Sequence, residues 1–161
     1  MTRRPPEWTD TAPVKVRASR EIHATPAEVW AAICDHARWP EWFEAIDGCE
    51  PTGGEGLGST RTVTVAKAPI HEEFIVWDEP TSWGFTVLSA AGPLGRVAES
   101  LNERIDIQVL SDDRVRVTYL MAFGPRRFTG PVFRVLKGQL TKNLRTALAG
   151  LERFIEAERV S

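Results

Sequence analysis

The chain has 161 residues, with 20 lysine and arginine residues, 22 acidic residues and a net charge of -2. A chain of this length forms one domain with a conventional core, because folding at this size buries roughly 70% of the unfolded surface. The near balance of charge gives no electrostatic case for nucleic acid or an anionic membrane surface as a partner. Two cysteines without a secretory segment favour a cytoplasmic protein that has no disulfide bonds.

Residues 1–13 are rich in proline and arginine and contain no apolar run. We therefore expect a flexible N-terminal arm, without a signal peptide or a transmembrane helix, and no integral membrane association. A half-buried strand is predicted next, from about Val14 to His23, because apolar and polar residues alternate there with a period of two.

A specific helix-start signal follows this strand. Thr25 can cap the helix, Pro26 suits its first turn, and the Glu28 side chain can accept a hydrogen bond from the cap backbone. A short helix is therefore predicted. A second short helical piece begins near Asp35 and is interrupted at Pro40.

From residue 44 to residue 123 the pattern changes to short apolar or β-branched runs, separated by glycine, proline and aspartate. This pattern is typical of an antiparallel meander. We expect strands at residues 45–50, 59–66, 71–78, 82–89, 97–110 and 114–123.

The last segment returns to helical spacing. From a start near Thr129 or Gly130, apolar residues recur at intervals of three and four, namely Phe133, Leu136, Leu140, Leu144, Leu148, Leu151 and Ile155. A long helix with one apolar stripe needs a broad surface to pack on, and the sheet is the candidate. Gly138 interrupts this helix, either to leave room for a ligand or to allow close packing against a strand.

Both the order of these elements and several short motifs are similar to those of a known family. The motifs are the run at residues 24–30, Asp35, the run at residues 39–42, Gly56-Leu57-Gly58 before a strand, and Glu79-Pro80. Over residues 14–158 the chain resembles the START-like (SRPBCC) superfamily, in its polyketide cyclase/dehydrase branch. The resemblance implies an α+β helix-grip fold, in which a curved seven-stranded antiparallel sheet wraps on the long C-terminal helix and two short helices follow the first strand. Residues 14–161 would then form a single START-like domain.

The resemblance also implies a cavity between the sheet and the last helix. It names no ligand, because the superfamily includes aromatic polyketide cyclases, lipid carriers, quinone-binding proteins, hormone receptors and chaperone co-activators. Side chains on the inner sheet face and the helix stripe would line this cavity or simply fill the core, and they are Trp83, Phe85, Tyr119, Met121, Phe123, Phe133, Leu136 and Leu140. Trp39, Trp42 and Phe43 would form an entrance lid or anchor the short helices on the sheet.

Charged residues on the inner face are more informative, because a buried charge needs a partner. Arg20, Arg61, Glu99 and Glu103 share the inward parity of their strands. They would form an internal arginine–carboxylate pair that orients a polar ligand group, or reach water where the strand ends splay apart.

Tyr119 is the only tyrosine in the chain and stands near the middle of a strand, on the inner parity. It would bind a ligand carbonyl, donate a proton in an aldol-type cyclisation and dehydration, or satisfy a backbone carbonyl. His71 would suit general base chemistry only on an inner face, and the parity of Phe74 and Val76 predicts that His71 is exposed.

No metal site and no cofactor are expected. His23, His36 and His71 are far apart in the sequence, the cysteines lack metal-ligand spacing, and no glycine-rich phosphate loop follows a strand and opens a helix. The pair Arg126-Arg127 is too small a basic patch for nucleic acid.

The leading hypothesis is binding of a small hydrophobic molecule, such as a lipid, a quinone or a polyketide-like aromatic, in the internal cavity. One alternative is a polyketide cyclase or dehydratase in which Tyr119 and Arg20 move a proton. Another is a protein-binding regulator that uses the outer face of the sheet. The sequence allows a homodimer and does not decide among these functions.

Overall fold

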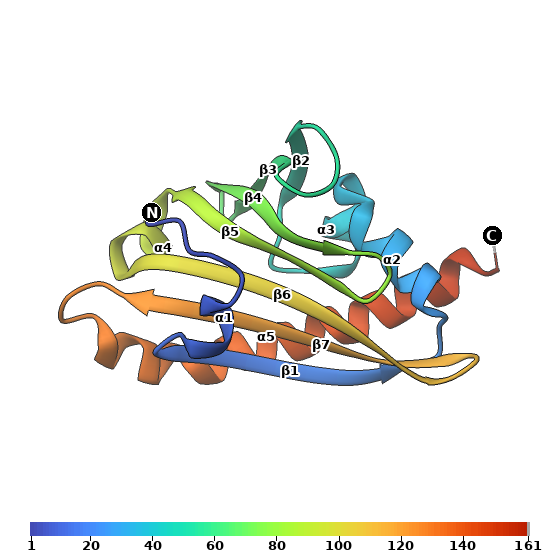
Figure 1. Cartoon of the computed structure of the whole chain (residues 1–161). Helices are drawn as coiled ribbons and strands as arrows, with labels where there is room; N and C mark the ends of the chain where they lie inside the picture. The colour runs from blue at the N-terminus through green and yellow to red at the C-terminus, as the bar shows by residue number, and fades with distance from the viewer. Residues whose placement is uncertain (161) are drawn as a thin grey trace.

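The computed structural model describes residues 1–160 and contains a seven-stranded antiparallel sheet that curves around one long helix, α5 (Gly130–Glu158) (Figure 1). The strand order across the sheet is β1-β7-β6-β5-β4-β3-β2. This arrangement confirms the predicted helix-grip fold. The strands are β1 (Val14–Ile22), β2 (Gly48–Gly53), β3 (Thr60–Val65), β4 (Ala68–Asp78), β5 (Ser82–Ala90), β6 (Ala98–Ser111) and β7 (Arg114–Pro125), and the shorter helices are α1 (Trp8–Thr11), α2 (Pro26–Cys34), η1 (His36–Arg38), α3 (Trp39–Trp42) and α4 (Gly92–Val97).

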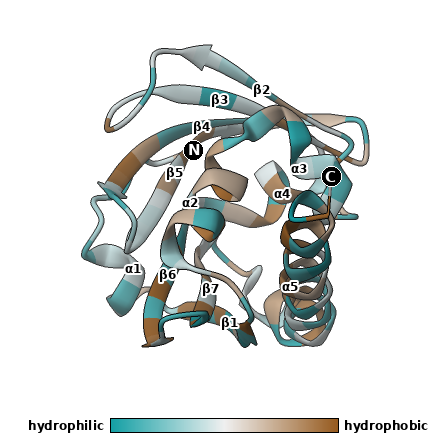
Figure 2. Ribbon diagram, turned by 90° about the vertical axis from the view of Figure 1, so that its right-hand side faces the viewer, coloured by the Kyte–Doolittle hydropathy of each residue, from teal (hydrophilic) through white to brown (hydrophobic). Residues whose placement is uncertain are grey.

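Strands β1 and β2 lie at opposite edges of the sheet, so the chain between them must cross its concave side. The helices α2, η1 and α3 make this crossing, and Figure 2 shows them within the curve of the sheet, next to α5. The predicted cap starts α2. Thr25 Oγ1 accepts a hydrogen bond from the Glu28 backbone N–H at 3.3 Å, and the Glu28 carboxylate accepts one from the Thr25 N–H at 2.7 Å.

Three short segments differ from the sequence prediction, and one of them is β4, which begins at Ala68 and not at residue 71. β2 begins at Gly48 and not at residue 45, because the chain first turns after α3, where the Ile46 N–H donates to the Phe43 carbonyl at 2.9 Å. The glycine–proline break after β5 forms the helix α4, with Gly92 at a φ of 71° and Pro93 in the first turn. This helix matters for the site, because it lies at one end of the cavity described below.

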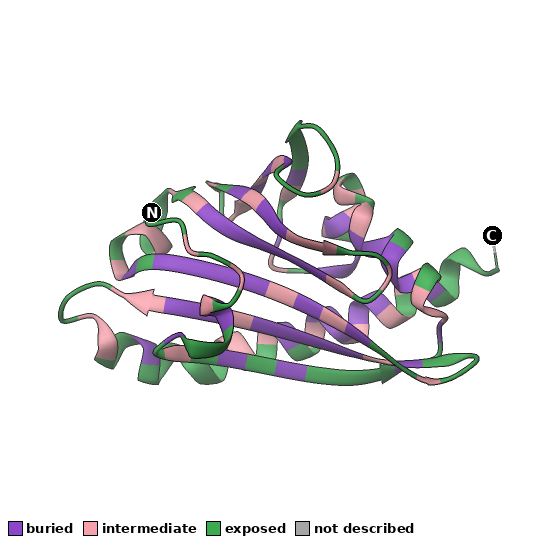
Figure 3. Cartoon of the chain, in the orientation of Figure 1, coloured by how far each residue is buried: buried purple, intermediate pink, exposed green. Residues whose placement is uncertain are grey.

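Residues 1–13, expected from the sequence to form a flexible arm, lie across the outer face of the sheet (Figure 1). Within this segment Thr9 is buried, and its Oγ1 accepts a hydrogen bond from Asn102 Nδ2 at 3.2 Å. The segment covers outer-face positions of the central strands, where Asn102 and Ala122 are fully buried. Figure 3 shows long buried stretches along these strands. The simple alternation of buried and exposed residues therefore fails in β6 and β7, where both faces are covered.

Helix α5 approaches α3 so closely at Gly150 that a Cβ atom there would overlap the backbone carbonyl of Trp42. A Cβ atom at Gly138 would meet nothing within 4 Å, and this position is exposed, so the glycine opens onto solvent and not onto a ligand.

These two glycines of α5 give opposite expected results for one substitution. We expect Gly150→Ala to lower the free energy of unfolding by about 1–3 kcal/mol through overpacking. Gly138→Ala should raise it by up to about 1 kcal/mol, because alanine has the higher helix propensity. Urea unfolding curves measure both changes. A Gly150→Ala protein as stable as Gly138→Ala would contradict the close approach of α3 and α5.

Candidate functional site

A cavity of about 220 Å³ lies between the inner face of the sheet, α3 and α5. Apolar side chains form most of its wall, as the resemblance implied. Many of the side chains predicted from parity and helical spacing lie in this wall, namely Trp39, Phe43, Arg61, Phe85, Glu103, Tyr119, Met121, Phe123 and Leu140. The cavity is therefore the candidate binding site.

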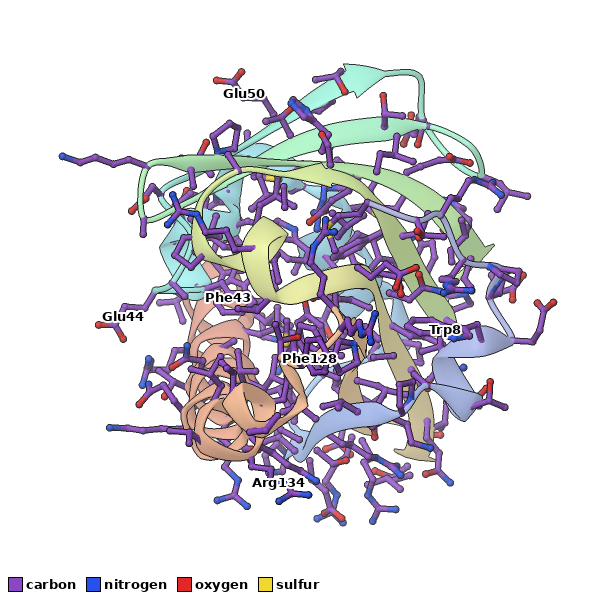
Figure 4. The ribbon with its side chains drawn as sticks, turned by 90° about the vertical axis from the view of Figure 1, so that its left-hand side faces the viewer. Trp8, Phe43, Glu44, Glu50, Phe128 and Arg134 are labelled. Atoms are coloured by element: carbon purple, nitrogen blue, oxygen red, sulfur yellow. The ribbon has the colours of Figure 1, made fainter. Side chains whose placement is uncertain are left out.

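The mouth of the cavity lies at the end of the molecule where α4 and the start of α5 are found. Its partly exposed wall residues include Ala45 after α3, Ile70 at the start of β4, Leu94 in α4, and Leu140 in α5. Figure 4 looks at this end, with Phe128 near the middle of the view and Glu44 at its edge. A ligand would enter between α4, α5 and the turn that joins β3 to β4.

Arg61 is the most constrained charged residue in the wall, with a side chain that is 1% exposed. Its Nε donates to Glu72 Oε2 at 2.6 Å, and the two residues are direct cross-strand partners in β3 and β4. Its guanidinium carbon lies 4.0 Å from the ring centroid of Trp39 and 4.8 Å from that of Trp83. The ion pair and the cation–π contacts together keep a full positive charge inside an apolar wall.

The terminal nitrogens of Arg61 differ in their contacts. Nη1 lies 3.3 Å from His36 Nδ1, whereas the buried Nη2 has no hydrogen-bond partner among residues 1–160. A buried donor without a partner costs about 1–3 kcal/mol. An oxygen atom of a bound molecule would remove that cost, and Arg61 lines the cavity, so Nη2 is its candidate polar contact.

His36 is an uncharged hydrogen-bond acceptor for the Arg61 guanidinium. Burial, together with the positive charge of Arg61, lowers the pKa of His36 to about 4. The ring is therefore uncharged at pH 7, so Nδ1 is able to accept from Arg61 Nη1. His36 also stacks on Phe74, with the ring centroids 5.2 Å apart.

A second polar pair lies across the cavity on β6 and β7. The Tyr119 hydroxyl donates to Glu103 Oε2 at 2.5 Å, and both side chains are buried. Burial, reinforced by the negative charge of Glu72, raises the pKa of Glu103 to about 8. Glu103 is thus mostly protonated at pH 7. Its other oxygen, Oε1, has no hydrogen-bond partner in the described part of the chain.

The polar wall therefore presents donors at neutral pH: an N–H of Arg61 and the carboxylic O–H of Glu103. Such a wall fits a ligand oxygen that accepts hydrogen bonds, as a carbonyl does. Among residues 1–160 no group of three or more His, Cys, Asp or Glu side chains could hold a metal ion.

Several predicted candidates lie elsewhere. Arg20 stands on the edge strand β1, and it pairs with Glu152 of α5 through Nε at 2.6 Å on the outside of the cavity. Trp42 and Trp83 are buried behind the wall, and Phe133 packs against Phe123 at a centroid distance of 5.0 Å. Leu136 is 38% exposed, one turn before the wall residue Leu140.

Strand register and side-chain alternation explain where two further candidates, Glu99 and His71, lie. Glu99 is exposed and bonded to Thr2, because a register shift between Ala98 and Ser100 turns it to the outer face. His71 is exposed, as its neighbours' parity predicted, and its Nδ1 lies 2.8 Å from Thr62 Oγ1.

The sequence reasoning missed Glu72 and His36. A signal for Glu72 was present, since it shares the parity of Phe74 and Val76, and that parity had already placed its neighbour His71 outside. His36 lies in the short helix η1, where no period marks an inner face.

Two comparisons of the amino-acid sequence bear on the family. The chain matches a family model described as polyketide cyclase / dehydrase and lipid transport over residues 13–156. It is also similar to Rv2574, an uncharacterised protein of Mycobacterium tuberculosis. The two are 29% identical over 156 residues, which cover 93% of this chain and 89% of that protein.

Solved structures share the fold at lower identity. A START superfamily protein from Mycobacterium smegmatis has a TM-score of 0.72 at 17% identity, over 89% of this chain and 97% of that one. The ZhuI aromatase/cyclase from Streptomyces sp. R1128 has a TM-score of 0.72 at 15% identity, over 92% and 96% of the two chains. These identities show the fold alone. Because the family model spans nearly all of the sequence, the chain belongs to the polyketide cyclase/dehydrase and lipid transport family.

Proposed function

We propose that the protein binds a small, mostly apolar molecule in the cavity, with an oxygen of that molecule held by Arg61. The observation that carries this proposal is the buried Nη2 of Arg61, which has no partner in the described chain and belongs to the wall of an otherwise apolar cavity. The protonated Glu103 adds a second donor to the same wall. A molecule with a carbonyl at one end and an apolar body satisfies both features.

The size of the cavity narrows the choice among a lipid, a quinone and a polyketide-like aromatic. About 220 Å³ is below the range of roughly 300–1,000 Å³ typical of sites for drug-sized ligands. This volume favours a compact aromatic carbonyl compound, such as a quinone, over a lipid with two acyl chains.

The proposal can be tested with 1,4-naphthoquinone as the probe, by calorimetry at pH 7. The test variant is Arg61→Met combined with Glu72→Leu, so that no unpaired charge is left inside. We expect its affinity to fall about 10- to 100-fold, since a hydrogen bond to a charged group contributes about 1.5–3 kcal/mol.

Arg20→Met is the matched control, because it removes an arginine that lies outside the cavity. Its affinity should equal that of the unmodified protein. Equal binding of the probe and its deoxygenated analogue naphthalene would contradict the role of Arg61. Absence of binding for both compounds, with no apolar molecule co-purifying, would contradict the cavity proposal itself.

A second candidate function is catalysis of an aldol-type cyclisation, and the chemistry of Glu103 favours it. With the substrate carbonyl held at Arg61, the ionised form of Glu103 would remove the α-proton, and the guanidinium would stabilise the enolate oxygen that develops. The enolate carbon would then attack a second carbonyl of the substrate, and the Glu103 O–H would return the proton to the new alkoxide. Tyr119 would act by positioning Glu103 through their hydrogen bond. Arg20, the partner considered from the sequence, is too far outside to take part in this scheme. Glu103→Gln separates the two functions, since it would preserve binding and abolish turnover.

A further inference from the structure

Exposed apolar side chains gather at the mouth end of the molecule. Phe128 is 83% exposed and Val135 81%, and Val132 and Leu136 are about 40% exposed. Single exposed apolar residues are ordinary, but these four lie within nine consecutive residues, in the loop before α5 and its first turns. In sequence they lead directly to Leu140, one turn after Leu136, which lines the cavity.

The loop holds Phe128 outward by its backbone. Phe128 has a φ of 68°, a conformation that a bulky residue rarely adopts. The loop is tied to the end of α4, because the Arg126 N–H donates to the Val97 carbonyl at 2.9 Å and Thr129 Oγ1 donates to the same carbonyl at 2.7 Å. The exposed ring is thus presented by a hydrogen-bonded loop.

The sequence on both sides of these side chains carries positive charge only. No acidic residue occurs between Asp113 and Glu152, whereas that interval contains Arg114, Arg116, Arg126, Arg127, Arg134, Lys137, Lys142 and Arg145. The net charge of -2 for the whole chain therefore hides a strongly cationic segment.

The cations next to the exposed apolar side chains lack acidic partners, whereas Arg114 and Arg116, at the start of β7, both pair with Glu21. Most arginines elsewhere in the fold pair with carboxylates, as Arg38 does with Glu41 and Arg159 with Glu28. Within residues 1–160, Arg127, Arg134 and Lys137 form no ion pair, and Figure 4 shows Arg134 pointing outward at this end. The two acidic residues labelled in this view, Glu44 and Glu50, point outward at its edges.

We propose that this mouth surface, formed by Arg127, Phe128, Val132, Arg134, Val135, Leu136 and Lys137, docks on an anionic lipid bilayer. No helix in the described chain is long and apolar enough to cross a membrane, so the contact would be peripheral. An anionic bilayer matches both properties of the surface, since it attracts unpaired arginine and lysine and accepts apolar side chains at the headgroup boundary. A nucleic acid would match only the charge, and an acidic protein partner is an alternative that the test below separates.

The orientation follows from the position of the mouth. With Phe128 and Val135 at the bilayer, the cavity opens toward the lipid and its partly exposed wall residues Leu94 and Leu140 face the same side. An apolar molecule could then pass between bilayer and cavity without crossing water. The docking itself does not depend on which molecule the cavity binds.

Co-sedimentation with phosphatidylcholine vesicles, with and without phosphatidylglycerol, tests this inference on the full chain. We expect binding only to the anionic vesicles, and weaker binding at high salt. Arg134→Gln with Lys137→Gln should reduce the affinity by at least about tenfold. Phe128→Ser with Val135→Ser should reduce it also for the anionic vesicles, while leaving the binding of the naphthoquinone probe in the cavity unchanged.

The matched control is Arg114→Gln with Arg153→Gln, which removes the same charge from exposed positions at the far end of β7 and of α5. This control should bind the anionic vesicles as the unmodified protein does. An equal loss in both charge variants would overturn the inference, because it would reduce the effect to overall charge. No binding to either type of vesicle would also overturn it, and would leave an acidic protein as the partner to seek.

Discussion

Arg61→Met is expected to lower the free energy of unfolding by about 3–5 kcal/mol, measured by urea unfolding at pH 7. The substitution keeps an apolar side chain of similar length but removes the positive charge 2.6 Å from the Glu72 carboxylate. Glu72 is 5% exposed, so its charge would remain in an apolar environment without compensation. The substitution would also remove the cation–π contacts that the guanidinium makes with the rings of Trp39 and Trp83.

Two controls separate this mechanism from a general loss of packing. Adding Glu72→Leu to Arg61→Met should recover most of the lost stability, because replacing both members of a buried ion pair by apolar residues is often neutral. Arg20→Met breaks an ion pair whose arginine is 44% exposed, so the cost should stay within about 1 kcal/mol. If Arg61→Met cost no more than Arg20→Met, the described ion pair would not be a buried one.

The second large effect is a dependence of stability on pH that comes from Glu103. Its pKa is about 8 in the folded chain, against a reference value of 4.5. The folded state therefore holds the proton more tightly than the unfolded state does. This contribution to stability is fully present below about pH 4.5 and is lost as the pH rises through 8. Raising the pH from about 5 to about 9 should therefore lower the free energy of unfolding by roughly 3–4 kcal/mol through Glu103 alone.

Glu103→Gln removes the titrating proton and keeps the shape of the side chain. The difference in unfolding free energy between the variant and the unmodified protein should therefore move in favour of the variant as the pH rises, measured by urea unfolding at several pH values. Glu99→Gln makes the same chemical change on the same strand at an exposed position, and should give no such trend. A flat difference for Glu103→Gln would mean that Glu103 is ionised already at low pH.

The sequence predicted the fold closely because its strongest signals are local. The cap at Thr25, the apolar stripe that ends at Ile155, and the break at Asp112-Asp113 each specify a boundary through backbone chemistry. Parity also placed Arg61, Glu103 and Tyr119 on the inner face, since side chains alternate strictly within a regular strand.

The rest depended on contacts between distant segments. Glu72 became the partner of Arg61 through strand register, and Arg20 was drawn outward by Glu152, which lies on a helix far along the chain. Neither partner follows from the local pattern around the arginine. The cover that residues 1–13 give to the outer sheet face has the same origin, because it rests on side chains such as Asn102. A whole-chain charge, similarly, cannot show how its charges are distributed over the surface.

The aromatic rings around Arg61 come from α3, β4 and β5, and the same rings form the hydrophobic core. Mutations of these aromatic residues that alter ligand binding at Arg61 would therefore also destabilise the fold. The outer wall is different, since Ile70, Leu94 and Leu140 come from separate elements and are only partly buried. Directed evolution toward longer or wider compounds should accordingly begin with these three positions and leave the arginine and its aromatic neighbours intact.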